Sequence, residues 1–92
     1  MRPTLRQIEY FVAVADHGAF GTAARALCVS QPSLSKQLAT MEDELGAVLI
    51  ERTSRRVMLT PVGRKLLQRG RTILREVGEF RAIARGAIGL FG

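Results

Sequence analysis

The chain has 92 residues, of which 47 % are hydrophobic, and it carries a net charge of +6 at pH 7. Its length suits one globular domain, its apolar runs are too short to span a bilayer, and its polar, amphipathic N-terminus differs from a secretory signal peptide. The lone cysteine, Cys28, cannot form an internal disulfide and fits a reducing cytoplasm. We interpret Cys28 as a small buried apolar side chain, the alternative being a reactive thiol.

The first predicted element is a helix from about Thr4 to His17. Thr4 can cap its start and Gly18 ends it. We interpret His17 as an exposed residue at the negative end of the helix dipole rather than as a ligand. The apolar face of this helix consists of Leu5, Ile8, Phe11, Val12 and Ala15.

Residues 20–46 predict two short helices joined by a tight turn at residues 28–30. Ser30 can cap the second helix, and Pro32 is tolerated in its first turn because no donor is needed there. Two helices packed steeply across such a turn form a helix-turn-helix unit, which offers its second helix to the DNA major groove. Their apolar stripes are Phe20, Ala23, Ala24 and Leu27, then Leu34, Leu38, Met41 and Leu45.

The opposite face of the second helix carries side chains suited to reading DNA. Gln can bond adenine in a bidentate way, Ser can bond a base edge or a phosphate, and Lys can bond guanine or a phosphate. The carboxylates of residues 42–44 lie at the far end, where phosphates would repel them, so we expect the N-terminal half to enter the groove. The alternative is a solvated polar face on an ordinary bundle helix. The residues concerned are Gln31, Ser33, Ser35, Lys36 and Gln37.

A small hairpin should follow, because residues 48–52 and 57–59 favour strands and a basic turn separates them. Three helices plus such a hairpin form a winged helix-turn-helix, so the predicted fold class is mainly α. We expect Arg55 to insert into a narrow minor groove, which attracts arginine. Arg52 and Arg56 should lie near phosphates or internal carboxylates. The alternative for Arg52 is that it pairs with an acidic neighbour and only packs.

Thr60 and Pro61 predict the start of a long helix, and the residues that follow form an apolar heptad seam. A helix of this length has little left to bury in so small a domain, so we expect it to pair with its counterpart in a second subunit. The alternative is a helix folded back onto its own core. The residues expected in the dimer interface are Leu66, Ile73, Val77, Phe80 and Ala84.

Taken together, residues 5–85 resemble the N-terminal DNA-binding domain and linker helix of LysR-type transcriptional regulators. The stretches that carry the resemblance are Leu5-x-x-Ile8-x-x-Phe11, Gly18-Ala19-Phe20-x-x-Ala23-Ala24-x-x-Leu27, Val29-Ser30-Gln31-Pro32-Ser33-Leu34-Ser35, Leu45-Gly46-x-x-Leu49-x-Glu51-Arg52 and Leu59-Thr60-Pro61-x-Gly63. The resemblance implies a winged helix-turn-helix over residues 1–60 and a dimerisation helix over residues 61–88. It also implies a frayed tail over residues 89–92 that leads to an effector-binding domain.

The resemblance also implies roles for single residues. Base contacts fall on Gln31, Pro32, Ser35, Lys36 and, in the wing, Arg55. The expected phosphate contacts are Ser30, Ser33, Arg52, Arg56 and Thr60. Such proteins dimerise through the linker helix and usually form tetramers, and a small-molecule or redox effector would act on the C-terminal domain, with no cofactor in this one.

Three positions depart from the family's pattern. Lys36 stands where arginine is common, which lowers bidentate selectivity for guanine. Ala19 replaces a frequent serine and so removes a capping hydroxyl, and Ile50 replaces a common phenylalanine. The stretches that resemble the hydrogen-peroxide-sensing subgroup are residues 20–21, 42–46, 51–55 and 71–77.

Charge and composition also separate the classes of function. Residues 52–92 carry ten Lys/Arg and two Asp/Glu, which suggests a polyanionic partner, expected to be double-stranded DNA. A membrane surface fits less well, because the chain has no Trp for the apolar face such helices need. We expect no enzyme, since there is one His, one Cys and no metal-ligand cluster. A protein-interaction module would use the long helix but would not need the polar face or the arginine-rich hairpin.

Overall fold

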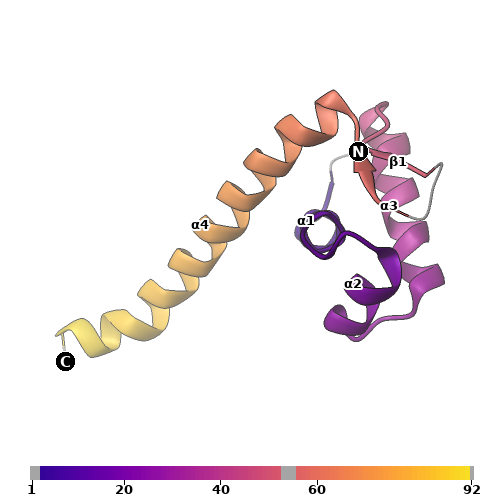
Figure 1. Cartoon of the computed structure of the whole chain (residues 1–92). Helices are drawn as coiled ribbons and strands as arrows, with labels where there is room; N and C mark the ends of the chain where they lie inside the picture. The colour runs from indigo at the N-terminus through magenta and orange to yellow at the C-terminus, as the bar shows by residue number, and fades with distance from the viewer. Residues whose placement is uncertain (1–2, 53–55, 92) are drawn as a thin grey trace.

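The computed structural model describes residues 3–52 and 56–91 of the chain. Its architecture is mainly helical with a two-stranded antiparallel sheet, as predicted, and Figure 1 shows a cluster of helices from which the last helix extends. The strand register pairs Ile50 with Leu59 and Glu51 with Met58. The elements are α1 (Leu5–His17), α2 (Phe20–Leu27), α3 (Gln31–Leu45), β1 (Ile50–Glu51), β2 (Met58–Leu59) and α4 (Pro61–Phe91).

The predicted helix caps are confirmed. The Thr4 hydroxyl accepts from the backbone N of Gln7 at 3.0 Å, and the Gln7 side chain accepts from the backbone N of Thr4 at 3.0 Å. Ser30 likewise accepts from the backbone N of Ser33 at 3.1 Å. Gly18 ends α1 at φ 74°, a left-handed conformation that glycine adopts without steric cost. These caps satisfy backbone groups that helix ends would otherwise leave unpaired.

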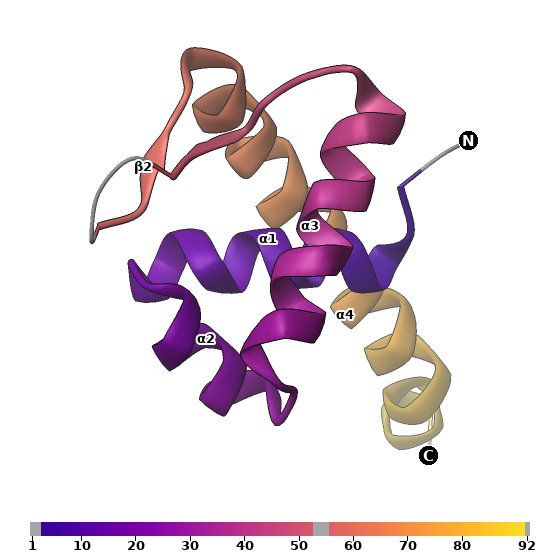
Figure 2. The same ribbon diagram turned by 90° about the vertical axis from the view of Figure 1, so that its right-hand side faces the viewer.

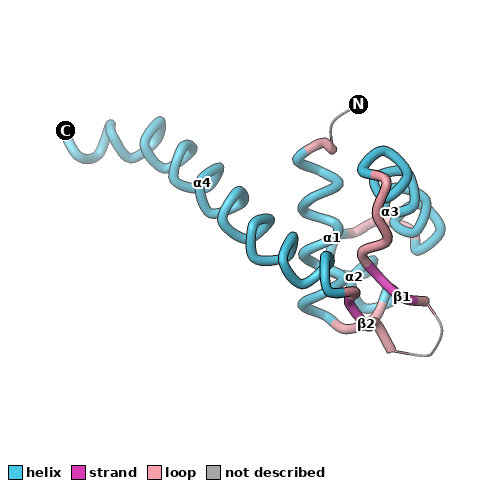
Figure 3. Tube along the Cα trace, turned by 90° about the horizontal axis from the view of Figure 1, so that it is seen from above, coloured by secondary structure: helices cyan, strands magenta, loops and turns pink. Residues whose placement is uncertain are grey.

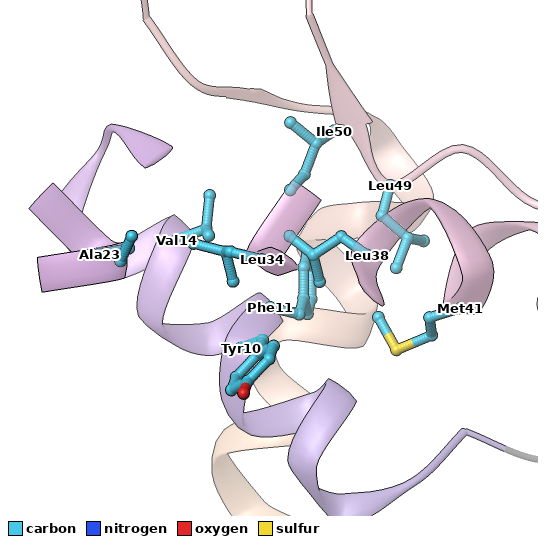
Figure 4. Packing of buried hydrophobic residues seen from close by; sticks show 10 residues of the cluster. Tyr10, Phe11, Val14, Ala23, Leu34, Leu38, Met41, Leu49 and Ile50 are labelled. Atoms are coloured by element: carbon cyan, nitrogen blue, oxygen red, sulfur yellow. The ribbon is translucent and has the colours of Figure 1, made fainter. Parts of the chain in front are cut away.

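The core lies where α1, α2, α3 and the hairpin meet. It takes up most of the apolar stripes that the sequence predicts, but Leu5 is 51 % exposed and Leu45 is 38 % exposed. Figure 4 shows side chains from these four elements converging. Val14, Leu34, Leu38 and Leu49 are less than 2 % exposed. Burying each such side chain contributes about 1.5–3 kcal/mol, so this cluster fixes how α3 sits on α1.

The wing is attached to α3 by one carboxylate. The Glu42 side chain accepts from the backbone N of Leu49 at 2.8 Å and from that of Ile50 at 3.1 Å. The Arg52 guanidinium lies 3.3 Å from the same carboxylate and stacks over the Phe20 ring, 5.4 Å from its centroid. The C-terminal half of the helix expected to read DNA therefore holds the hairpin in place.

The beginning of α4 packs tightly on the domain. A side chain at Gly63 would place its Cβ 2.2 Å from the Leu49 carbonyl oxygen, a distance that only glycine avoids. A Cβ at Gly70 would lie 3.1 Å from Val12 on α1. An ion pair between Arg71 and Asp16 lies farther along the same contact. Close packing at these two glycines, together with the ion pair, therefore docks the first three turns of α4.

Beyond this contact, α4 leaves the domain, as Figures 1 and 3 show. Phe80 is 76 % exposed and Ile83 is 65 % exposed. The alternative of a helix folded back onto its own core therefore holds for the base of α4 and not for its outer part. The helix continues to Phe91, so residues 89–91 are helical where the sequence predicts a frayed tail, and residue 92 lies outside the described residues. Within the described ranges no helix is both long enough and apolar enough to cross a bilayer.

The prediction that Cys28 is buried is wrong. The residue is exposed and adopts the left-handed conformation, at φ 60° and ψ 41°. It ends α2, where its backbone N–H bonds the carbonyl of Arg25, and this turn leaves the side chain at the surface. His17 is exposed at the end of α1, as predicted.

Replacing Glu42 by alanine should destabilise the fold by about 1–3 kcal/mol, because the part-buried backbone N–H groups of Leu49 and Ile50 would lose their acceptor. The free energy of unfolding, measured by urea titration, tests this. Glu44→Ala is the matched control, since Glu44 is an exposed carboxylate on the same helix. Equal stability of the two variants would show that the carboxylate does not anchor the wing.

Candidate nucleic-acid interface

The N-terminal turns of α3 form an exposed polar surface on a buried apolar foundation. Figure 2 shows α3 crossing in front of α1, with α2 beside its N-terminal end. Leu34 and Leu38 are 0 % and 1 % exposed, so this side of the helix packs into the core. The side chains predicted to contact bases lie between these buried positions along the helix. Gln31, Pro32 and Lys36 are exposed, and Ser35 is half-buried.

Helix α3 and the wing share one hollow with both polar and apolar walls. It has a volume of about 170 Å³ and brings side chains of α3 together with residues that come 16 or more positions later in the chain. The Gln31 side-chain oxygen also lies 3.5 Å from where a Cβ on Gly21 would sit, so the first turn of α2 bounds the space beside it. The hollow is lined by Phe20, Gln31, Ser35, Glu51, Arg52, Arg56 and Val57.

Two predicted phosphate contacts, Ser30 and Ser33, border this surface. Both residues are exposed, and Ser30 accepts from Ser33 as the cap of α3. Accepting a hydrogen bond leaves the O–H of Ser30 able to donate to a phosphate oxygen. These two residues therefore combine a capping role with a position at the start of the exposed helix.

The structure gives Thr60 partners within its own chain. Its hydroxyl donates to the Val48 carbonyl at 2.7 Å and accepts from the backbone N of Gly63 at 2.9 Å. Its backbone N donates to the Leu49 carbonyl at 3.0 Å. A phosphate only accepts hydrogen bonds, and both donors of Thr60 are already used. Thr60 therefore caps α4 and ties it to the residues just before β1, and its phosphate contact stays a prediction.

The three wing arginines stand differently. Arg52 has the partners that the packing alternative gives it, because its charge is paired with Glu42 and its plane rests on Phe20. Its phosphate contact stays a prediction. Arg56 is exposed and is one of the residues that line the hollow. Arg55, the predicted minor-groove residue, lies outside the described residues, and its role stays a prediction.

The outer part of α4 presents a second surface, an apolar hollow shared with the start of α1. Leu5 is 51 % exposed and lines this hollow together with Ile73, Val77 and Phe80 of α4. Ala84 is also exposed. Leu66, by contrast, packs against the core of its own chain. The predicted dimer seam therefore divides into a part that is already buried and a part that is open.

Sequence reasoning missed two residues that shape the interface. Glu42 was counted only among carboxylates repelled by phosphates, and no local pattern marks it as the anchor of the wing. Gln7 is 5 % exposed and donates through Nε2 to the Gln37 side-chain oxygen at 3.2 Å. The Thr4-x-x-Gln7 spacing is a capping-box signature, which could have identified the first half of that arrangement. Ala19, which starts α2 without a side-chain cap, behaves as the sequence predicts.

Comparison with known proteins places this geometry in context. The chain is 51 % identical over 86 residues to a probable hydrogen peroxide-inducible genes activator of Mycobacterium xenopi, covering 94 % of this chain and 46 % of that protein. It is 49 % identical over 80 residues to the DNA-binding transcriptional dual regulator OxyR of Escherichia coli K12, covering 87 % and 26 %. The chain thus spans between a quarter and a half of the length of these relatives.

Solved structures agree on the fold. Oxidized OxyR of Corynebacterium glutamicum superposes with a TM-score of 0.91 at 47 % identity, covering 97 % of this chain and 27 % of that one. The BenM DNA-binding domain in complex with catB site 1 DNA superposes with a TM-score of 0.90 at 37 % identity, covering 97 % and 96 %. The family model described as bacterial regulatory helix-turn-helix protein, lysR family, matches residues 5–64. The chain therefore belongs to the LysR family of bacterial helix-turn-helix transcriptional regulators.

Proposed function

We propose that this chain binds double-stranded DNA sequence-specifically, as the DNA-binding unit of its regulator. The observation that carries the proposal is the polar N-terminal half of α3, exposed over a rigid core and sharing one hollow with the basic wing. A solvated face of an ordinary bundle helix would not need a second basic element beside it. The BenM domain, which has the same fold, was solved in complex with DNA, which supports the proposal.

In the proposed complex, the first turns of α3 enter the major groove. Gln31 offers the bidentate amide that suits adenine, and Lys36 offers a charge to guanine or phosphate. Pro32 and Ser35 lie on the same helix end, where they contact bases by van der Waals packing and hydrogen bonding. Ser30 and Ser33 donate to flanking phosphates. The wing follows the neighbouring minor groove, where Arg55 is the inserted side chain and Arg56 lies near the backbone.

The functional unit in this proposal is a homodimer that binds an interrupted, roughly palindromic site. The apolar hollow of α4 and Leu5 fits a second copy of the same surface, because exposed apolar faces of this kind mark protein interfaces. Two copies joined through α4 would set two α3 helices on successive major-groove faces of the duplex. A tetramer is the corresponding proposal for the full-length protein.

Regulation by an effector is a proposal for the whole protein. The name of the Mycobacterium xenopi relative, a probable hydrogen peroxide-inducible genes activator, supports peroxide as the signal. The effector would act beyond the DNA-binding unit, which needs no cofactor of its own in this proposal. Transcription from the bound site, compared with and without peroxide, tests it.

Two substitutions on α3 separate base reading from charge. Gln31→Ala should relax the choice of base at one position per half-site, losing about 1–3 kcal/mol on the preferred sequence alone. Lys36→Ala should weaken binding, and Lys65→Ala, which removes an exposed lysine of α4, is its control for charge. Binding titrations against a panel of duplexes measure both effects. An equal loss on every duplex for Gln31→Ala would mean that this residue reads no base.

The affinity for duplex DNA should fall steeply with salt, with a logarithmic slope of about −0.9 per phosphate neutralised.

Arg55→Ala should reduce both the affinity and the preference for A·T pairs beside the half-site, because a narrow minor groove attracts arginine. Arg85→Ala, on the far part of α4, is the matched control. Unchanged A·T preference in the Arg55 variant would contradict the wing proposal.

Phe80→Glu should weaken dimerisation by at least about tenfold, because it places a charge in an apolar contact. Sedimentation equilibrium measures the dissociation constant. Gln68→Glu is the control, since Gln68 is exposed on the same helix but does not line the apolar hollow. A Phe80 variant that dimerises like the control would place the interface elsewhere.

A further inference from the structure

Gln7 on α1 has an amide whose orientation is fixed by chemistry. Gln7 is only 5 % exposed, and no other polar residue in the described part of the chain is buried. Its neighbour on one side is the backbone N–H of Thr4, at 3.0 Å, which can only donate. The atom facing Thr4 is therefore the amide oxygen, and the NH2 group must face the other way, toward α3.

This fixed NH2 group in turn orients the amide of Gln37. Gln7 Nε2 donates to Gln37 Oε1 at 3.2 Å, and an NH2 group cannot accept, so Gln37 must present its oxygen to Gln7. Gln37 is exposed on α3. Its own NH2 group, with two donors, is the part of the amide that remains for a ligand. The capping box of α1 thus decides the polarity that a residue of α3 shows outward.

Gln37 lies one helical turn after Ser33, so the two residues share one flank of α3. The side chains proposed to meet bases lie on the neighbouring face, and a flank of a helix in the major groove approaches the phosphates of the groove wall. Phosphate oxygens only accept hydrogen bonds. An outward NH2 group would donate to them, whereas an outward carbonyl oxygen would be repelled.

We propose that Gln7 is a positioning residue for DNA binding, which holds the Gln37 amide so that its NH2 group donates to a backbone phosphate of the duplex. The inference rests on the DNA-binding function proposed above. Gln7 itself makes no contact with DNA in this arrangement. Because the contact is to a phosphate, it contributes equally on all duplex sequences.

The substitution Gln7→Glu tests the proposal with little disturbance of the fold. Glutamate in this position completes the preferred capping box, since its oxygen still accepts from Thr4. At pH 8 it is ionised and cannot donate to Gln37, whose amide would then turn its NH2 group inward and its oxygen toward the phosphate. Duplex affinity should fall about three- to tenfold while the unfolding midpoint stays equal or rises.

A double-mutant cycle with Gln37→Met separates this effect from added charge or altered stability. Gln37→Met alone should weaken duplex binding to a similar degree, and Gln7→Glu should cost nothing further when it is added to the Gln37→Met variant. An equal loss for Gln7→Glu in both backgrounds, or no loss in either, would overturn the inference and leave the proposed function standing. A wild-type chain that binds no duplex even at low salt would refute the proposed function and this inference together.

Discussion

The contact between the Glu42 carboxylate and the hairpin backbone holds the interface together. Two backbone N–H groups and one guanidinium converge on this side chain, so β1 cannot slide along α3 without losing all three contacts. The same helix offers Gln31 at its other end. One rigid helix thus sets the spacing between the surface proposed for the major groove and the wing proposed for the minor groove. In the proposed complex this negative charge lies at the end of α3 that points away from the phosphates.

The long helix α4 also has two parts with different roles, a base that packs on the domain and an outer part that is exposed. Its first three turns pack so closely that a Cβ at Gly63 would lie 2.2 Å from the Leu49 carbonyl oxygen and one at Gly70 would lie 3.1 Å from Val12 of α1, and these contacts fix the direction in which the helix leaves the domain. Its outer turns carry Phe80 and Ile83 into solvent. In the proposed dimer, the packing of the first turns of α4 on the domain would set the position of the second subunit. It would thereby set the separation of the two α3 helices on DNA. The molecule is elongated as a result, with extents of 52 × 26 × 21 Å.

Much of this fold could be predicted because its signals are local. Capping residues, left-handed glycines and apolar residues at helical spacing each act within one or two turns, and Thr4, Gly18 and Ser30 mark the helix ends as expected. The exposed face of α3 followed from the same periodicity. The exposure of Cys28 and the partners of Thr60 and Arg52 depend instead on what a turn or a distant element places beside them.

The sequence alone determined the helices, their ends, the wing and the polar character of α3, because backbone hydrogen bonding and amphipathic periodicity are properties of short stretches. Which polar groups already have partners became visible once the elements were packed together. In the folded chain the Thr60 hydroxyl is hydrogen-bonded to Val48 and Gly63, and the Arg52 charge is paired with Glu42. The Gln37 amide is oriented by its hydrogen bond from Gln7. A donor that bonds across the fold cannot be recognised from its neighbours in the chain, since its partner lies 10 or 30 residues away.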